Sequence, residues 1–158
     1  EILVKTASSD DWQDLTHVGV GVSQVLPIVL MALLSEPGDL LIFEQPELHL
    51  HPKVQSRLCD FFCAFTEADR QCVIETHSEY LINRLRLRIV QGSPESLGKS
   101  SSVFFITKTN GESRFDRVDI NEYGAILDWP KDFFDQTDEE VERILVEASN
   151  KRRREKGG

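Results

Sequence analysis

The fold of this chain is decided by the stretch Leu40-Leu-Ile-Phe-Glu-Gln-Pro-Glu-Leu-His-Leu-His-Pro52. Four apolar residues open the stretch, which is typical of a strand in the interior of a parallel sheet. A carboxylate, Glu44, and an amide, Gln45, follow at once. Polar groups at the carboxyl end of such a strand lie at the ligand crevice of an open α/β sheet. The stretch therefore predicts a buried strand that presents both side chains at a binding site, although a core strand followed by an ordinary polar loop fits the same residues.

Strand and helix patterns alternate along the rest of the chain. Strands are expected at residues 2–5, 40–43 and 72–75. Helices are expected at residues 23–34, from Pro52 through Phe65, and from a Ser78 cap to about Val90. A loop at residues 91–101 then leads to strands at 103–107 and 114–120 around a hairpin turn at 109–112. This order predicts a parallel α/β layer with a C-terminal addition.

Two of the helices have an apolar stripe. In the helix that Pro52 opens, the residues expected to pack on the sheet are Val54, Leu58, Phe61, Phe62 and Phe65. A last helix is predicted from the capping box Thr137-Asp-Glu-Glu140, with Val141, Ile144, Leu145 and Ala148 at helical spacing.

Three landmarks of the chain resemble, in order, those of ATP-binding-cassette-type ATPases. Residues 40–52 resemble the Walker B strand and its following loop, where the family usually has Asp-Glu-Pro-Glu and this chain has Glu44-Gln45-Pro46-Glu47. Upstream, Val18-Gly-Val-Gly-Val-Ser-Gln-Val-Leu-Pro27 resembles a divergent signature motif that lacks the common Leu-Ser-Gly-Gly-Gln form. Downstream, Val73-Ile-Glu-Thr-His-Ser78 resembles the switch-histidine strand. The branch that the chain resembles most includes SMC-like, RecF-like and OLD-family ATPases, which act in DNA repair or maintenance and in defence against phage.

The C-terminal third resembles an uncharacterised domain appended to a set of predicted bacterial ATPases of this type, in particular at Gly124-Ala-Ile-Leu-Asp-Trp-Pro-Lys-Asp-Phe-Phe-Asp135. The resemblance implies an α/β fold: the C-terminal half of a P-loop ABC-type ATPase sheet flanked by helices, with a C-terminal hairpin and helix. It divides the chain into residues 1–100, the C-terminal part of the ATPase domain, and residues 101–158, the appended element.

The resemblance also implies that the phosphate-binding P-loop precedes the signature motif, in sequence absent from this chain. The chain begins with Glu1 rather than Met, so we expect a piece of something longer or a processed product. Gly98-Lys99-Ser100 has the ending of a P-loop, but five residues separate Gly92 from Gly98 where the motif requires four. A helix is expected before this segment and a strand after it, which is the reverse of the motif. We therefore expect poor ATP binding by this chain alone and ATP hydrolysis only together with a missing N-terminal half.

The resemblance implies a role for each polar residue of the Walker B stretch. Glu44 takes the place of the Walker B aspartate and would accept hydrogen bonds from the water shell of Mg²⁺, a hard cation that prefers oxygen. Gln45 takes the place of the catalytic glutamate, and its amide could orient the nucleophile but cannot accept a proton from it. Either a substitution made to trap ATP or a natural variation, in which Glu47 serves as the base, accounts for Gln45. Natural variation is favoured, because ATPases with this C-terminal domain resemble the chain in having Glu-Gln-Pro-Glu here.

The other two landmarks imply phosphate contacts. His77 resembles the switch histidine that hydrogen-bonds the γ-phosphate, and a histidine that caps the following helix together with Ser78 is the alternative. Gly19 and Gly21, followed by Ser23 and Gln24 at a helix start, would form an anion site, although glycines before a helix are usually only a turn. In cassette ATPases this surface contacts the γ-phosphate that is bound to the other subunit. The resemblance therefore implies a homodimer of the full-length protein.

Two further classes of function fit parts of the sequence. His49 and His51 form a His-x-His pair that could bind a transition metal if Glu44, Glu47 and His77 lie nearby, as in metal-dependent hydrolases. Barrel hydrolases that use such a pair need a longer chain, on the order of 250 residues. The other class is an inactive dimerisation or regulatory module. Its contact surface would be Trp129-Pro-Lys-Asp-Phe-Phe134, whose aromatic rings could equally pack onto the core.

Composition excludes several partners. The formal net charge of −9 argues against nucleic-acid binding by this segment alone. Its basic residues gather in two clusters, Arg84, Arg86 and Arg88, and Lys151-Arg-Arg-Arg154. The second cluster is interpreted as a solvated helix end.

The sequence also predicts a cytoplasmic location. No apolar run is long enough to cross a bilayer, and no signal peptide opens the chain. Cys59 and Cys63 lie four residues apart on one expected helix, which fits packing in the core of a protein in a reducing cytoplasm.

Overall fold

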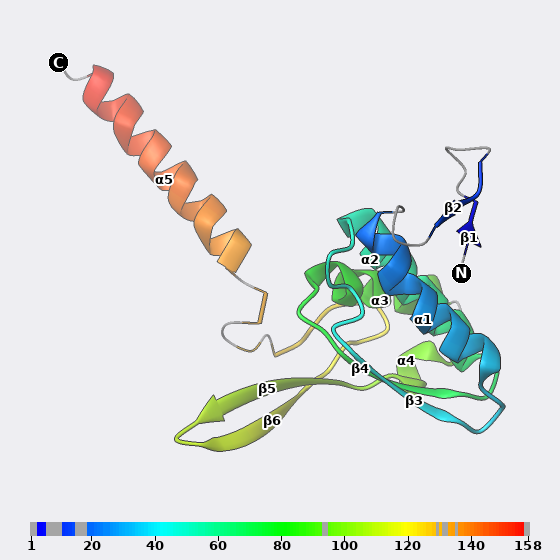
Figure 1. Cartoon of the computed structure of the whole chain (residues 1–158). Coiled ribbons are helices and arrows are strands. Elements are labelled where there is room, and N and C mark those ends of the chain that lie inside the picture. The colour runs from blue at the N-terminus through cyan, green and yellow to red at the C-terminus, as the bar shows by residue number, and fades with distance from the viewer. Residues whose placement is uncertain are drawn as a thin grey trace. The chain divides into compact units, whose positions relative to one another are not determined.

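The computed structural model describes residues 3–5, 11–14, 19–92, 95–128, 130, 133–134 and 136–156 (Figure 1). The chain divides into two compact units, one of residues 1–100 with 122–124 and one of residues 101–121 with 125–158. The first unit contains the parallel strands, and the second contains a hairpin and a long helix.

Strands and helices alternate in the first unit. Its elements are β1 (Leu3–Val4), β2 (Gln13–Asp14), α1 (Val20–Leu34), β3 (Leu40–Glu44), α2 (Pro52–Thr66), β4 (Gln71–Glu75), α3 (Glu79–Gln91) and α4 (Leu97–Ser100). β1 pairs antiparallel with β2. The strand expected at residues 2–5 is therefore present only at Leu3–Val4, and Ile2 lies outside the described residues.

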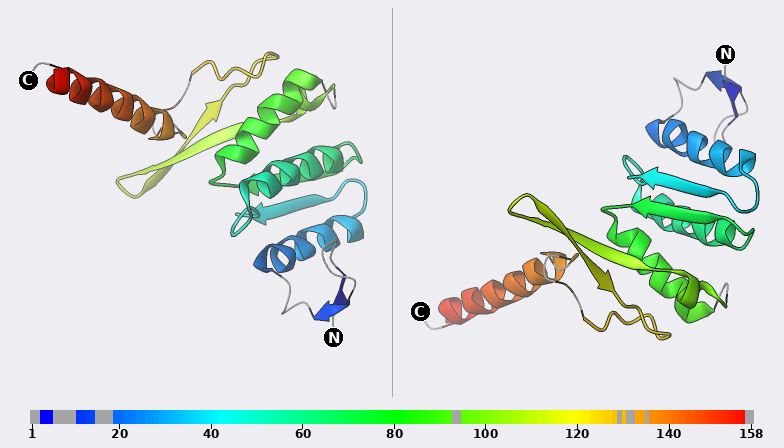
Figure 2. Two further views of the ribbon diagram at one scale, coloured as in Figure 1. Left: turned by 90° about the horizontal axis from the view of Figure 1, so that it is seen from above. Right: turned by 90° about the horizontal axis from the view of Figure 1, so that it is seen from below.

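β3 and β4 form a parallel pair, as expected for two strands joined by a helical crossover. Their register places Leu40 opposite Gln71 and Glu44 opposite Glu75, so both strands end at the same edge of the sheet. Figure 2 shows the two strands side by side, with α2 and α3 next to each other beyond them. The predicted α/β class, a parallel pair flanked by helices and followed by a hairpin and a helix, is confirmed.

Alternate residues of the two strands face a helical core. Phe43 packs on Phe62 of α2, with ring centroids 5.0 Å apart. The buried cluster that joins the strands to the helices consists of Ile28, Phe43, Leu50, Leu58, Cys59, Phe62, Cys63, Leu81 and Leu97. The apolar stripe predicted for α2 is confirmed except at Val54, which is 40% exposed in the first turn of the helix. Cys59 and Cys63 are free and buried, as expected.

The opposite face of the strands is largely open in the first unit. Leu40, Ile42 and Val73 are 52%, 62% and 49% exposed. The prediction of a buried strand at residues 40–43 therefore holds for Phe43 and is wrong for Leu40 and Ile42. A parallel strand is buried on both faces only where helices cover both, and the described elements leave this face mostly uncovered.

Helix α1 begins three residues before the expected position. Gly19 is its N-cap residue, and the amide of Val22 already donates to the carbonyl oxygen of Gly19 at 2.9 Å. Ser23 lies one turn inside the helix, where its hydroxyl donates to the carbonyl oxygen of Val20 at 2.8 Å. The next two helices begin as predicted: Pro52 is the first residue of α2, and the Ser78 hydroxyl accepts from the amide of Leu81 at the start of α3.

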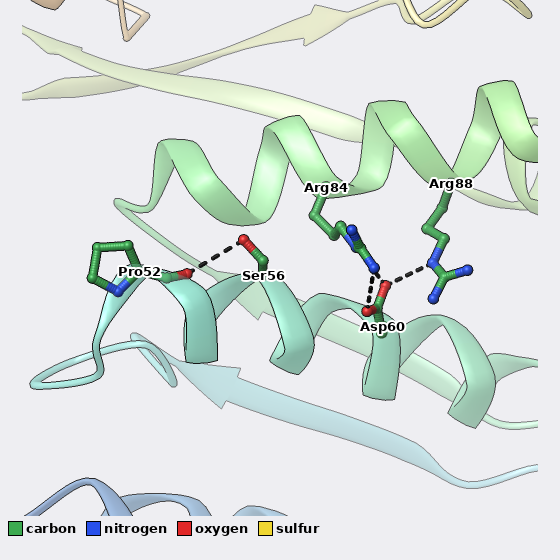
Figure 3. Close-up of polar contacts among 5 residues, drawn as sticks. All are labelled: Pro52, Ser56, Asp60, Arg84 and Arg88. Atoms are coloured by element: carbon green, nitrogen blue, oxygen red, sulfur yellow. Dashed lines mark hydrogen bonds and ion pairs between the residues drawn. The ribbon is translucent and has the colours of Figure 1, made fainter.

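An ion cluster fastens α2 to α3 (Figure 3). The Asp60 carboxylate accepts two hydrogen bonds from Arg84, each 2.7 Å, and one from Arg88 at 2.6 Å. The hydrogen bond from Arg84, and then that from Arg88, hold the pKa of Asp60 below its ordinary value of 3.8. Arg86 donates to the carbonyl oxygen of Gly124 at 2.7 Å. The first basic cluster of the sequence therefore holds the fold together.

The second unit contains β5 (Val103–Thr109), β6 (Glu112–Val118) and α5 (Gln136–Lys156). β5 and β6 form the predicted hairpin around Asn110 and Gly111, which have φ angles of 54° and 87°. Phe133 is buried and packs edge-on against Phe105, with centroids 5.3 Å apart. Trp129 and the side chain of Thr137 lie outside the described residues, so the capping box is not described, although residue 137 is within α5. Among the described residues no helix is long and apolar enough to cross a membrane.

Candidate functional site

Polar residues follow β3 and β4 at their common edge. Because the strands are parallel and in register, Glu44 and Glu75 are the last residues of neighbouring strands, and both are exposed. The structure therefore brings the Walker B position and the residues before His77 to one edge of the sheet, which is where ligands bind in open α/β sheets.

Gln45 is held against the end of β4. Its backbone amide donates to the carbonyl oxygen of Glu75 at 2.9 Å, which continues the strand pairing by one residue. Its side-chain Nε2 lies 3.4 Å from Glu75 Oε1, a long hydrogen bond on an exposed surface. Gln45 has a φ angle of 43°, so the chain turns sharply here.

Glu47 is buried, with 7% of its surface exposed. Its Oε1 accepts a hydrogen bond from the backbone amide of His77 at 2.7 Å. Its Oε2 is shielded from water and has no hydrogen-bond partner in the described structure. The carboxylate therefore joins the loop after β3 to the segment after β4, with Oε1 engaged by the His77 amide and Oε2 shielded from water.

Further hydrogen bonds surround the bond between Glu47 and the His77 amide. The amide of Leu50 donates to the carbonyl oxygen of Glu47 at 3.0 Å, and Gln55 Nε2 of α2 donates to the carbonyl oxygen of Leu50 at 2.8 Å. The Ser78 hydroxyl donates to Gln55 Oε1 at 2.5 Å. The two loops at the sheet edge are therefore fixed to each other and to the start of α2.

The His77 imidazole extends into solvent, with 77% of the side chain exposed. Its Nε2 lies 3.7 Å from Glu75 Oε1, which is an ion pair only when the imidazole is protonated. Ser78, and not His77, is the N-cap of α3. The imidazole is therefore available to a ligand at the sheet edge.

The signature-like residues lie at the start of α1. Gly19 caps the helix, and Gly21 lies inside its first turn, where an added Cβ would be 3.3 Å from Leu50 Cδ2. The expectation that Ser23 and Gln24 open the helix is wrong, since both lie inside it. A groove of about 600 Å³ separates the first half of α1 from His49, Leu50 and His51.

The two histidines of the His-x-His pair are used differently. His49 has a φ angle of 62°, so the segment is not extended, and His51 Nδ1 accepts from the amide of Lys53 at the start of α2. Among the described residues no group of three His, Cys, Asp or Glu side chains could hold a metal ion. Gly98-Lys99-Ser100 lies in the short helix α4, with β5 after it, which agrees with its rejection as a P-loop.

Glu75 is the residue that the sequence interpretation missed. The sequence indicates only the last residue of a strand at this position, but the Glu75 side chain lies against both Gln45 and His77. Its signal was positional: it lies two residues before His77, at the end of the strand expected next to the Walker B strand.

Parallel strands β3 and β4 lead into Glu44-Gln45 and Glu75-Thr-His77, with a glycine-capped helix beside the loop, which is the arrangement expected of an ABC-type P-loop fold. Comparison with known families finds two matches along the chain. Residues 6–83 match the family described as "AAA domain, putative AbiEii toxin, Type IV TA system". Residues 98–144 match the family described as "Protein of unknown function (DUF3696)". The AAA family match thus covers residues 6–83, and the second family match follows it as an appended C-terminal domain.

A solved structure supports the fold. The chain is similar, with a TM-score of 0.51 and 12% sequence identity, to a structure titled "Structural biochemistry of ATP-driven dimerization and DNA stimulated activation of SMC ATPases". The match covers 69% of this chain and spans 59% of that chain. No curated protein matches the chain.

Proposed function

We propose that this chain contributes the Walker B and switch-histidine part of an ATP-hydrolysing site, and that a P-loop outside residues 1–158 completes it. The observation that carries the proposal is the common edge of β3 and β4, where Glu44 ends β3, Gln45 follows it, and His77 lies two residues after β4. In phosphoryl transfer, catalysis consists mainly of positioning and charge stabilisation, and this edge offers oxygen, amide and imidazole groups for both.

The residues at this edge suit Mg²⁺. Glu44 is an exposed carboxylate at the end of β3, and carboxylate oxygens are ligands that a hard cation accepts. We propose that Glu44 accepts hydrogen bonds from the water shell of the ion. When bound, Mg²⁺ would neutralise charge on the nucleotide phosphates.

The signature-like segment would act on the nucleotide of a second copy. The amides of the first turn of α1, beyond Gly19, form a positive helix end that suits an anion. The similar SMC structure has a title that describes ATP-driven dimerisation, and this supports a homodimer as the assembly for this chain. Gly19 and Gly21 would contribute by leaving the backbone accessible, with Ser23 and Gln24 at the flank of the same helix.

The missing half of the ATPase would cover the open sheet face. Leu40, Ile42 and Val73 expose apolar surface that a complete sheet of this type buries. We therefore assign residues 1–100 to the C-terminal part of the ATPase domain and residues 101–158 to the appended element.

Calorimetry with ATP and Mg²⁺ tests the proposal. This chain and a protein extended N-terminally to include a P-loop are titrated side by side. We expect binding by the extended protein only. Binding of equal affinity by the chain alone, or by neither protein, would refute the proposal.

A further inference from the structure

We propose that Glu75 is the general base of ATP hydrolysis in this protein, in place of the glutamate that Gln45 replaces. The inference rests on the proposed function and names the residue that performs its proton transfer. Of the carboxylates at the sheet edge, Glu75 is the one that lies within reach of both Gln45 and His77 in the described structure.

The two other candidates for the base do not fit. The Gln45 amide has no lone pair basic enough to accept a proton from water. Glu47 is 7% exposed, its Oε1 is engaged by the His77 amide, and its Oε2 is shielded from water. A base must lie within hydrogen-bond reach of the water that it deprotonates, so Glu47 is better placed to hold the His77 segment in position.

Glu75 has the exposure that Glu47 lacks. Its side chain is 51% exposed, and its Oε1 lies 3.4 Å from Gln45 Nε2 and 3.7 Å from His77 Nε2. The backbone hydrogen bond from Gln45 to Glu75 fixes the two residues side by side at the end of a parallel pair. Glu75 thus presents a carboxylate at the end of β4, at the same edge of the sheet as Gln45.

The chemistry balances with these groups. The oxygen of a water molecule attacks the γ-phosphorus and forms a new P–O bond, while the bond from this phosphorus to the β,γ-bridging oxygen breaks. The bridging oxygen leaves as part of ADP. The proton released by the water passes to the Glu75 carboxylate and from there to the phosphate product or to solvent. Gln45 would orient the water and Glu75 by donating from Nε2.

The test uses the full-length protein with its P-loop, and measures ATP affinity and single-turnover hydrolysis separately. For Glu75→Gln we expect unchanged ATP·Mg²⁺ affinity, a loss of hydrolysis rate on the order of 10²-fold or more, and accumulation of the ATP-bound dimer in size-exclusion chromatography. The matched variant Glu67→Gln, which removes an exposed carboxylate at the end of α2, should hydrolyse ATP at the wild-type rate.

Rescue separates proton transfer from a structural role. In the double variant Gln45→Glu with Glu75→Gln, a carboxylate returns to the end of β3, and we expect hydrolysis to recover at least tenfold over Glu75→Gln. Wild-type hydrolysis by Glu75→Gln would overturn the assignment of Glu75. Failure of the wild-type protein to bind or hydrolyse ATP would instead refute the proposed function.

Discussion

Gln45 has a positive φ angle of 43°, which is rare for a residue with a side chain and costs about 1 kcal/mol or more. His49, four residues later, has a φ angle of 62°. Such strain persists only where the surroundings impose it. The buried bond from the His77 amide to Glu47, together with the Gln55 and Ser78 bonds, supplies that constraint for the loop.

Glu47 gives the prediction at the residue scale. Glu47→Ala removes the acceptor of the His77 amide, so we expect a loss of about 1–3 kcal/mol of unfolding free energy. Glu47→Gln keeps an acceptor and removes a buried charge whose second oxygen has no partner, so we expect it to be at least 1 kcal/mol more stable than Glu47→Ala. Urea unfolding of the three proteins measures this, and equal stability of the two variants would show that the bond contributes nothing.

At the scale of elements, α2 and α3 are joined by charge as well as by apolar packing. Asp60 accepts from two arginines, and its side chain is 22% exposed. Arginine pairs with this bidentate geometry are stronger than ordinary surface ion pairs. The cluster lies away from the sheet edge, on the two helices that support it.

Asp60→Asn should therefore lower the unfolding free energy by about 1–2 kcal/mol, after discounting for partial exposure. The folded protein lowers the pKa of Asp60 below 3.8, so the stabilisation is fully present above that pH and disappears as pH falls through the lower folded value. Denaturant unfolding of both proteins, from neutral pH down to acid, should show a constant difference that shrinks only below pH 3.8. A difference that already disappears near neutral pH would contradict this account.

At the scale of the whole molecule, the sequence predicted the alternation of elements and the order of the landmarks, because apolar periodicity and capping residues such as Pro52 and Ser78 act locally. The prediction failed where the local structure depends on residues that are distant in the sequence. The start of α1 moved to Val20 because glycine can cap a helix without a side-chain bond. The open face at Ile42 depends on which elements are present to cover it.

The candidate site was predictable in part for the same reason. The positions of Glu44 and His77 at one edge follow from two parallel strands, which the apolar runs indicate. Neither the burial of Glu47 nor the contact of Glu75 with Gln45 could be read from spacing, since both depend on the sharp turn after β3.

Magnesium-dependent ATP hydrolysis by the full-length protein, compared between wild type and His77→Ala, tests the central claim most directly. The account predicts turnover by the wild type and a reduction of about tenfold or more in the variant, because the exposed imidazole lies at the sheet edge where the γ-phosphate would bind. Equal rates in the two proteins would contradict the claim that the common edge of β3 and β4 is the hydrolytic site.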